Sequence, residues 1–96
     1  MAAYVIYHQT ELSDPDAYRR DYQQAALASI ERFGGRPLVG GPFETLEGDA
    51  PGHRIVVHEF PDMETLKRWY NSEEFQKLIP VRQGLATGHL IVADGI

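Results

Sequence analysis

The residues best suited to chemistry in this 96-residue chain are histidines and an arginine that flank short apolar segments. His8 follows one such segment, His53 and Arg54 precede a second, and His89 precedes a third. If these segments pair as antiparallel strands, the four side chains gather at one end of a sheet. A histidine there could act as an acid or base near neutral pH, and Arg54 could hold an anion. The alternative is that polar residues simply occupy the ends of strands.

The strand register decides whether His8 and Arg54 cooperate. If they share a face, the charge of Arg54 favours the neutral imidazole of His8 at pH 7, which can accept a proton. We expect no metal and no cofactor. The chain has no cysteine and no His-x-His or Glu-x-x-His pair, and the odd spacing of His53 and His58 directs them to opposite faces of a strand.

Glu59 is an acidic residue within an otherwise apolar segment, and it is the second candidate catalytic group. It could be a buried base with a raised pKa, or it could pair with Arg82 or Arg54. An ion pair is the favoured interpretation, because an unpaired buried carboxylate is costly.

Tyr18 and Tyr22 belong to a stripe of residues spaced as on a helix, and Gly34-Gly35 ends that helix. The members of the stripe are Tyr18, Tyr22, Ala25, Ala26, Ser29, Ile30 and Phe33. As core residues they need one hydrogen-bond partner each, and as pocket residues they would bind a ligand between helix and sheet. Both interpretations stay open, with the core favoured. Trp69 and Tyr70 are predicted to be core residues.

The element that positions these residues is the strand predicted at 54–60. Its apolar residues occupy both alternating positions, which indicates a strand covered on both faces. Pro61 ends the strand, and Asp62 can cap a helix that begins immediately. Further strands are predicted at 3–9, 36–41 and 89–93. The second could extend through residue 47 after a bulge or kink, and Thr87-Gly88 is expected to interrupt the chain before the last strand.

Helices are predicted after Ser13-Asp14-Pro15, where either of the first two residues can act as the cap, and after Asp62. The second helical region continues from Ser72 and is split or kinked at Pro80. The order βαββαβ predicts one ferredoxin-like α+β domain over residues 1–96. It has a four-stranded antiparallel sheet, ordered 4-1-3-2, with helices on one face.

The helices of this fold cover only one face of the sheet, so the other apolar face needs a partner. A second copy packed sheet to sheet is the economical solution, and we expect a homodimer. The formal charge of −5 disfavours nucleic acid and anionic membranes, and no apolar run is long enough to span a bilayer. We expect a soluble, cytoplasmic, bacterial-type protein.

Motifs along nearly the whole chain resemble one bacterial family. They are, in order, Ala3-Tyr4-Val5-Ile6, Asp14-Pro15-x-x-Tyr18, Gly34-Gly35-Arg36, Leu46-Glu47-Gly48, Val56-x-x-Glu59-Phe60-Pro61, Trp69-Tyr70-x-Ser72 and Arg82. The chain is identified as similar to the domain-of-unknown-function family numbered 1330, in the dimeric α/β-barrel superfamily. The resemblance implies a ferredoxin-like subunit and a dimer, and it implies no reaction. His58 stands where an aliphatic residue is expected.

The expected function is binding of a small aromatic or carboxylate-bearing molecule between helices and sheet. If the protein is an enzyme, the available chemistry is cofactor-free proton transfer, as in an isomerase or a cofactor-independent oxygenase. His8 and Glu59 would be the acid–base groups, and the substrate-binding residues would be Tyr18, Tyr22, Arg54, His89 and Arg82. The alternative is a non-catalytic binding or interaction module with a filled core.

Overall fold

A four-stranded antiparallel sheet forms one layer of the protein. The computed structural model describes residues 1–52 and 54–96. The strands are β1 (Ala3–Leu12), β2 (Arg36–Pro42), β3 (Arg54–Phe60) and β4 (Ala86–Asp94). Their order is β2-β3-β1-β4, and each neighbouring pair is antiparallel. Read from the other edge this is 4-1-3-2, so the predicted ferredoxin-like sheet is confirmed.

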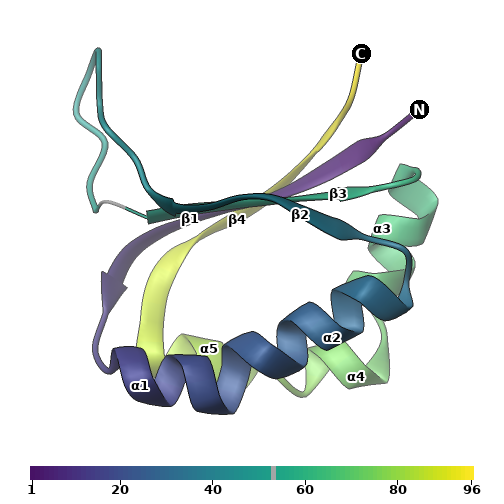
Figure 1. The fold of residues 1–96 in the computed structure, drawn as a ribbon, viewed down its shortest axis with the longest axis horizontal. Helices are drawn as coiled ribbons and strands as arrows, with labels where there is room; N and C mark the ends of the chain where they lie inside the picture. Colours follow the sequence, from purple (N-terminus) through teal and green to yellow (C-terminus); the bar gives the residue numbers. More distant parts are fainter. Residues whose placement is uncertain (53) are drawn as a thin grey trace.

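The helices form the second layer, and all of them lie on one side of the sheet (Figure 1). The first crossover contains α1 (Pro15–Tyr18), the π-helical turn η1 (Arg19–Gln23) and α2 (Gln24–Arg32), which follow one another without a break. The second contains α3 (Met63–Tyr70), α4 (Glu73–Gln76) and α5 (Ile79–Leu85). Pro80 stands in the first turn of α5 and so starts a new helix.

The helix starts follow the capping residues expected from the sequence. The Asp14 carboxylate accepts a hydrogen bond from the Ala17 amide at 3.0 Å, so Asp14 caps the first helix. The Asp62 carboxylate accepts one from the Thr65 amide at 2.7 Å, which lets α3 begin directly after β3. Ser72 caps α4 in the same way. Each cap satisfies an amide that has no partner within its helix.

The π-helical turn explains which side chains the first crossover buries. Tyr18, Tyr22, Ala26 and Ile30 recur every four residues and are all buried. An α-helix has 3.6 residues per turn, so a four-residue spacing drifts around its surface, and a wider turn corrects the drift. The backbone N–H of Gln24 bonds to the carbonyl of Arg19, five residues earlier. Ala25, predicted on the buried stripe, is exposed.

Two strand boundaries differ from the sequence predictions. β4 begins at Ala86 and runs through Gly88, which was expected to interrupt the chain. A Cβ at Gly88 would lie 2.9 Å from Cζ of Tyr7, so glycine leaves room for that ring within the sheet. β2 ends at Pro42 and does not extend to residue 47 as suggested.

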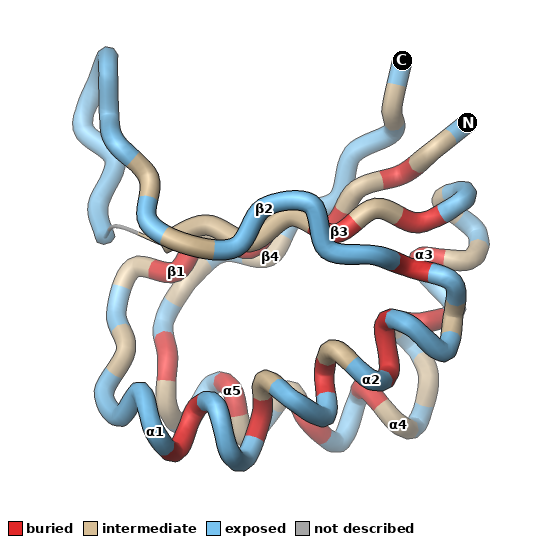
Figure 2. Tube along the Cα trace, viewed as in Figure 1, coloured by how far each residue is buried: buried red, intermediate tan, exposed pale blue. Residues whose placement is uncertain are grey.

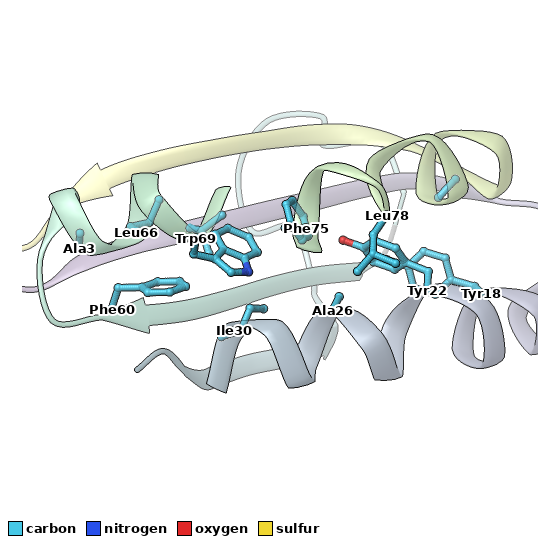
Figure 3. Packing of buried hydrophobic residues seen from close by; sticks show 12 residues of the cluster. Ala3, Tyr18, Tyr22, Ala26, Ile30, Phe60, Leu66, Trp69, Phe75 and Leu78 are labelled. Carbon is cyan, nitrogen blue, oxygen red and sulfur yellow. The ribbon is translucent and has the colours of Figure 1, made fainter. Parts of the chain in front are cut away.

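The core lies between the sheet and the helices (Figure 3). Trp69 stacks on Phe75 with ring centroids 4.2 Å apart and on Phe60 at 5.3 Å. Its indole N–H donates a hydrogen bond to the Ser29 hydroxyl at 2.9 Å, and that hydroxyl donates to a backbone carbonyl. The polar atoms of Trp69 and Ser29 are therefore satisfied, and Trp69 is a core residue as predicted.

The two faces of the sheet have different surroundings. In β1 the buried residues alternate with partly exposed ones, and the buried set faces the helices. Figure 2 shows the buried residues in the helices and at alternating positions of β1 and of the end of β3, whereas β2 has none. On the other side, the β2–β3 loop and both termini rise away from the sheet (Figure 1). No helix within the described ranges is long and apolar enough to cross a membrane.

Candidate functional site

A cavity of about 230 Å³ lies between the first crossover and the sheet. Its walls come from α1, η1 and α2 on one side and from the helix-facing residues of all four strands on the other, with Trp69 of α3 completing them. Most of the lining is apolar. The lining residues that carry polar side-chain groups are Tyr7, Tyr18, Tyr22, Gln23, Arg54, His58 and Trp69. Among the lining residues that the structure describes there is no aspartate or glutamate.

Three tyrosines supply the hydroxyl groups of the cavity. Tyr18 and Tyr22 come from successive turns of the first crossover, with ring centroids 5.2 Å apart, and Figure 3 shows them side by side. Tyr7 comes from β1 on the facing wall. Burial raises the pKa of all three phenols above the ordinary value. They are therefore protonated at neutral pH and can donate hydrogen bonds.

His58 supplies a side-chain nitrogen in the cavity that can accept a proton near neutral pH. It lies on the helix-facing side of β3, opposite Val5 of β1, and is 8% exposed. Its Nδ1 is buried without a hydrogen-bond partner among the described residues. Burial lowers the pKa of His58 below its ordinary value, so the imidazole is neutral at pH 7 and able to accept a proton.

Two arginines lie near the tyrosines, at different depths. Arg54 lines the cavity from the start of β3. Arg82 of α5 is 6% exposed and does not line the cavity, and its guanidinium carbon lies 5.2 Å from the ring centroid of Tyr7 and 5.8 Å from that of Tyr22. Neither arginine forms an ion pair with a residue that the structure describes. The cavity is thus more positive than the acidic protein as a whole.

His8 and His89 lie on the opposite face of the sheet from this cavity. His8 pairs with His89 of β4 and with Ile55 of β3, and the two imidazole centroids are 6.2 Å apart. The His8 Nε2 is 2.7 Å from the carbonyl oxygen of Pro51. Arg54 pairs with Gln9 and faces the helices, so His8 and Arg54 do not share a face. His53, expected in this group, lies outside the described residues.

Glu59 also lies on the face away from the helices. Its carboxylate accepts hydrogen bonds from Arg36 Nε at 2.8 Å and from the Tyr4 hydroxyl at 3.1 Å. The bond from Arg36, then the bond from Tyr4, lower the pKa of Glu59, opposite to the shift expected for a buried base. Its partner is Arg36 of β2, whereas the sequence suggested Arg82 or Arg54.

The structure therefore brings together four of the seven predicted site residues. Tyr18, Tyr22 and Arg54 line the cavity, and Arg82 contacts two of its tyrosines. His8, His89 and Glu59 lie on the other face. Within the described part of the chain, no three His, Asp or Glu side chains are placed to hold a metal ion.

Sequence reasoning missed His58 and Tyr7 as site residues. For His58 a signal was available in the alternation of its strand, whereas none singles out Tyr7 in a strand that is apolar at both alternating positions. Phe60 is the last residue before the turn into α3 and is fully buried, so residues 58, 56 and 54 share its helix-facing side. A histidine at such a position, where an aliphatic residue is expected, was a candidate for the pocket.

The chain belongs to a family without an assigned activity. Residues 2–96 match the family described as Domain of unknown function (DUF1330), which agrees with the resemblance seen in the motifs. None of the curated proteins matches the sequence significantly. The family assignment therefore agrees with the fold and does not indicate a reaction.

Solved structures similar to this chain share its fold at low sequence identity. A protein of unknown function from Rhodopseudomonas palustris has a TM-score of 0.73 and 20% identity, over 99% of this chain and 82% of that one. SnoaB, a cofactor-independent oxygenase from Streptomyces nogalater, has a TM-score of 0.71 and 13% identity, covering 99% and 93%. An ethyl tert-butyl ether (ethd) family protein from Bacillus halodurans has a TM-score of 0.67 and 12% identity, covering 100% of both chains.

Proposed function

We propose that the protein binds a small aromatic molecule with an acidic oxygen, such as a phenol, an enol or a carboxylic acid, in the cavity between the first crossover and the sheet. The observation that carries this proposal is the composition of the cavity wall. It combines apolar residues with three tyrosine donors, one neutral imidazole and Arg54, and it contains no carboxylate among the described residues. A wall of this kind favours a flat apolar ligand with one negative or hydrogen-bonding end.

The size of the cavity suits a ligand of this class. A dry apolar cavity of about 150 Å³ is large enough for benzene. The space here, about 230 Å³, therefore accommodates a substituted ring. An anion held there would also offset the positive charge of Arg54, which forms no ion pair with a described residue.

The proposed chemistry is cofactor-free proton transfer, with His58 as the proton acceptor. The tyrosines are too weakly acidic to be ionised at neutral pH, so they would donate hydrogen bonds to an oxygen that becomes negative. The likeness to SnoaB, a cofactor-independent oxygenase, supports this at the level of the fold. His8 and Glu59 would take no part, because they lie on the other face of the sheet.

The proposed assembly is a homodimer formed by the uncovered face of the sheet. Ile6 and Val57 pair at the centre of that face, flanked by Ile91, which is 57% exposed. Exposed apolar residues that lie next to one another are a common mark of a protein–protein interface. The raised β2–β3 loop and termini border this face and would surround the second copy (Figure 1).

A binding screen tests the ligand proposal. Thermal shift assays with phenols, enols and aromatic carboxylates should give a melting temperature that rises with ligand concentration. Ala26→Leu fills the cavity from α2 and should abolish the shift. The matched control is Ala25→Leu, because its side chain is exposed on the same helix. Equal shifts for both variants would place the ligand elsewhere, and no shift with any compound would reject the proposal.

Proton transfer is tested on the ligands that the screen identifies. A bound molecule with an acidic C–H should exchange that hydrogen for deuterium faster in D2O with the protein than without it, as followed by NMR. His58→Gln should remove the acceleration because glutamine cannot take up the proton. Binding without any acceleration would support the non-catalytic alternative.

A further inference from the structure

Arg82 occupies a position that is unusual for a charged residue. It is 6% exposed in α5, and the ion pairs of the described residues all involve other arginines. A buried cation normally lies beside an anion, because removing its hydration is costly. The contacts of Arg82 are aromatic instead, since its guanidinium lies over Tyr7 and Tyr22.

The arginine does not reach the cavity itself. Tyr7 and Tyr22 line the cavity wall and also contact Arg82, whereas Arg82 is not one of the lining residues. Arg82 Nη1 donates a hydrogen bond to the Tyr22 hydroxyl oxygen at 3.3 Å. That bond uses a lone pair of the oxygen and leaves the hydroxyl proton of Tyr22 available to another acceptor.

A hydroxyl that accepts a hydrogen bond from a cation becomes a better donor. The charge pulls electron density from the oxygen and strengthens the bond that its proton makes, and the effect is large where water is excluded. Within the described residues, Tyr22 is the cavity tyrosine whose oxygen accepts such a bond, because no side-chain hydrogen bond is made to the hydroxyls of Tyr7 and Tyr18.

We propose that the Tyr22 hydroxyl donates a hydrogen bond to an ionised oxygen of the bound molecule, and that Arg82 is the positioning residue that orients and polarises this donor. This inference rests on the proposed function and narrows it. The pocket prefers a phenolate, an enolate or a carboxylate over the corresponding neutral molecule. Arg82 supplies the compensating charge without touching the ligand.

A purely structural role for Arg82 makes a different prediction. If its guanidinium only packs between two rings, replacing it changes stability and leaves the ionisation of a bound ligand unaltered. The ionisation state of the ligand therefore separates the two roles, whereas a melting temperature does not.

The experiment uses para-nitrophenol, whose phenolate and phenol forms differ in absorbance, as the probe. Its apparent pKa is measured by pH titration while bound to the wild-type protein and to Tyr22→Phe, which removes only the hydroxyl. We expect the pKa of the bound probe to rise by about one unit in Tyr22→Phe and by a similar amount in Arg82→Gln. Arg82→Lys keeps the charge and should recover part of the difference.

The outcomes separate this inference from the proposed function. para-Nitroanisole has the same ring and no ionisable oxygen, so its binding reports only on the cavity. If both probes bind and Tyr22→Phe leaves the pKa of the phenol unchanged, the inference is overturned and the proposed function stands. If neither probe binds the wild-type protein, both fail. Should Arg82→Gln not fold, Tyr22→Phe still tests the donor, and Arg82→Lys tests the arginine, because the pKa of the bound probe should then lie between its values in the wild type and in Tyr22→Phe.

Discussion

Both faces of the sheet carry polar residues among apolar ones. They differ in whether the polar side-chain atoms have hydrogen-bond partners. On the uncovered face, Glu59 accepts hydrogen bonds from Arg36 and Tyr4, and His8 bonds to a carbonyl. On the helix-covered face, Nδ1 of His58 has no partner within the described chain. A buried polar atom without a partner is costly, and the ligand of the proposed function would supply the missing partner.

This contrast separates two uses of one sheet. The face with satisfied polar groups and an apolar centre is the one on which the proposed second copy would pack. The face with unsatisfied groups and an open space suits a small molecule. The two proposed partners, a second copy and a small molecule, would thus explain why β3 carries apolar residues on both sides.

The largest expected effect comes from a charge on the uncovered face. Val57→Asp should convert the dimer to a monomer or make the protein insoluble, because an unpaired carboxylate would be buried between the two sheets. Sedimentation at micromolar concentration measures the change. The control is Ala25→Asp on the exposed side of α2, which should remain dimeric. A wild-type protein that sediments as a stable monomer would contradict the assignment of this face.

The next effect concerns the packing of the cavity wall. Tyr22→Ala should lower the free energy of unfolding by about 3 kcal/mol, because the ring is 8% exposed and packs on Tyr18. Tyr22→Phe keeps the ring and should cost about 1 kcal/mol or less. Urea denaturation measures both variants. A loss below about 1 kcal/mol for the alanine variant would mean that the ring is not packed in solution.

A pH dependence distinguishes the two faces through their histidines. Burial holds the folded-state pKa of His58 below its ordinary 6.5, so as the pH falls the unfolded chain takes up this proton first. The contribution of neutral His58 to stability is complete above about pH 6.5 and is lost as the pH falls toward the folded-state pKa. Denaturation at several pH values should show this loss.

The matching variants assign that pH dependence to one residue. His58→Gln should flatten the dependence just below pH 6.5, whereas His89→Gln should retain it because the side chain is exposed on the other face. If the wild-type and His58→Gln curves have the same slope, His58 is not buried as the structure describes.

The smallest effects are expected from the two residues that sequence reasoning chose as catalytic. His8→Gln and Glu59→Gln should leave ligand affinity within about a factor of two, since neither residue lines the cavity. Calorimetry with a ligand from the screen compares them with His58→Gln, which should weaken binding about tenfold. A large loss of ligand affinity in His8→Gln or Glu59→Gln, with the oligomeric state unchanged, would indicate that the ligand binds on the uncovered face.

Local sequence patterns predicted the elements and their order well. Asp14 with Pro15, and Pro61 with Asp62, mark helix starts through proline geometry and side-chain capping, which depend only on neighbouring residues. The βαββαβ order then leaves few topologies, because crossovers are right-handed. These constraints are sufficient to predict the strand order without knowledge of any tertiary contact. The π-helical turn was not predicted, because it depends on the packing of Tyr18 and Tyr22 against the sheet.

The sequence by itself determined the fold, the identity of the central strand, and the presence of polar residues that could do chemistry. Only the tertiary structure decided which of those residues meet. A shift of one residue in strand register exchanges the two faces, and the register depends on pairing across the chain. That pairing put His58 and Arg54 beside the tyrosines and turned His8 and Glu59 away from them.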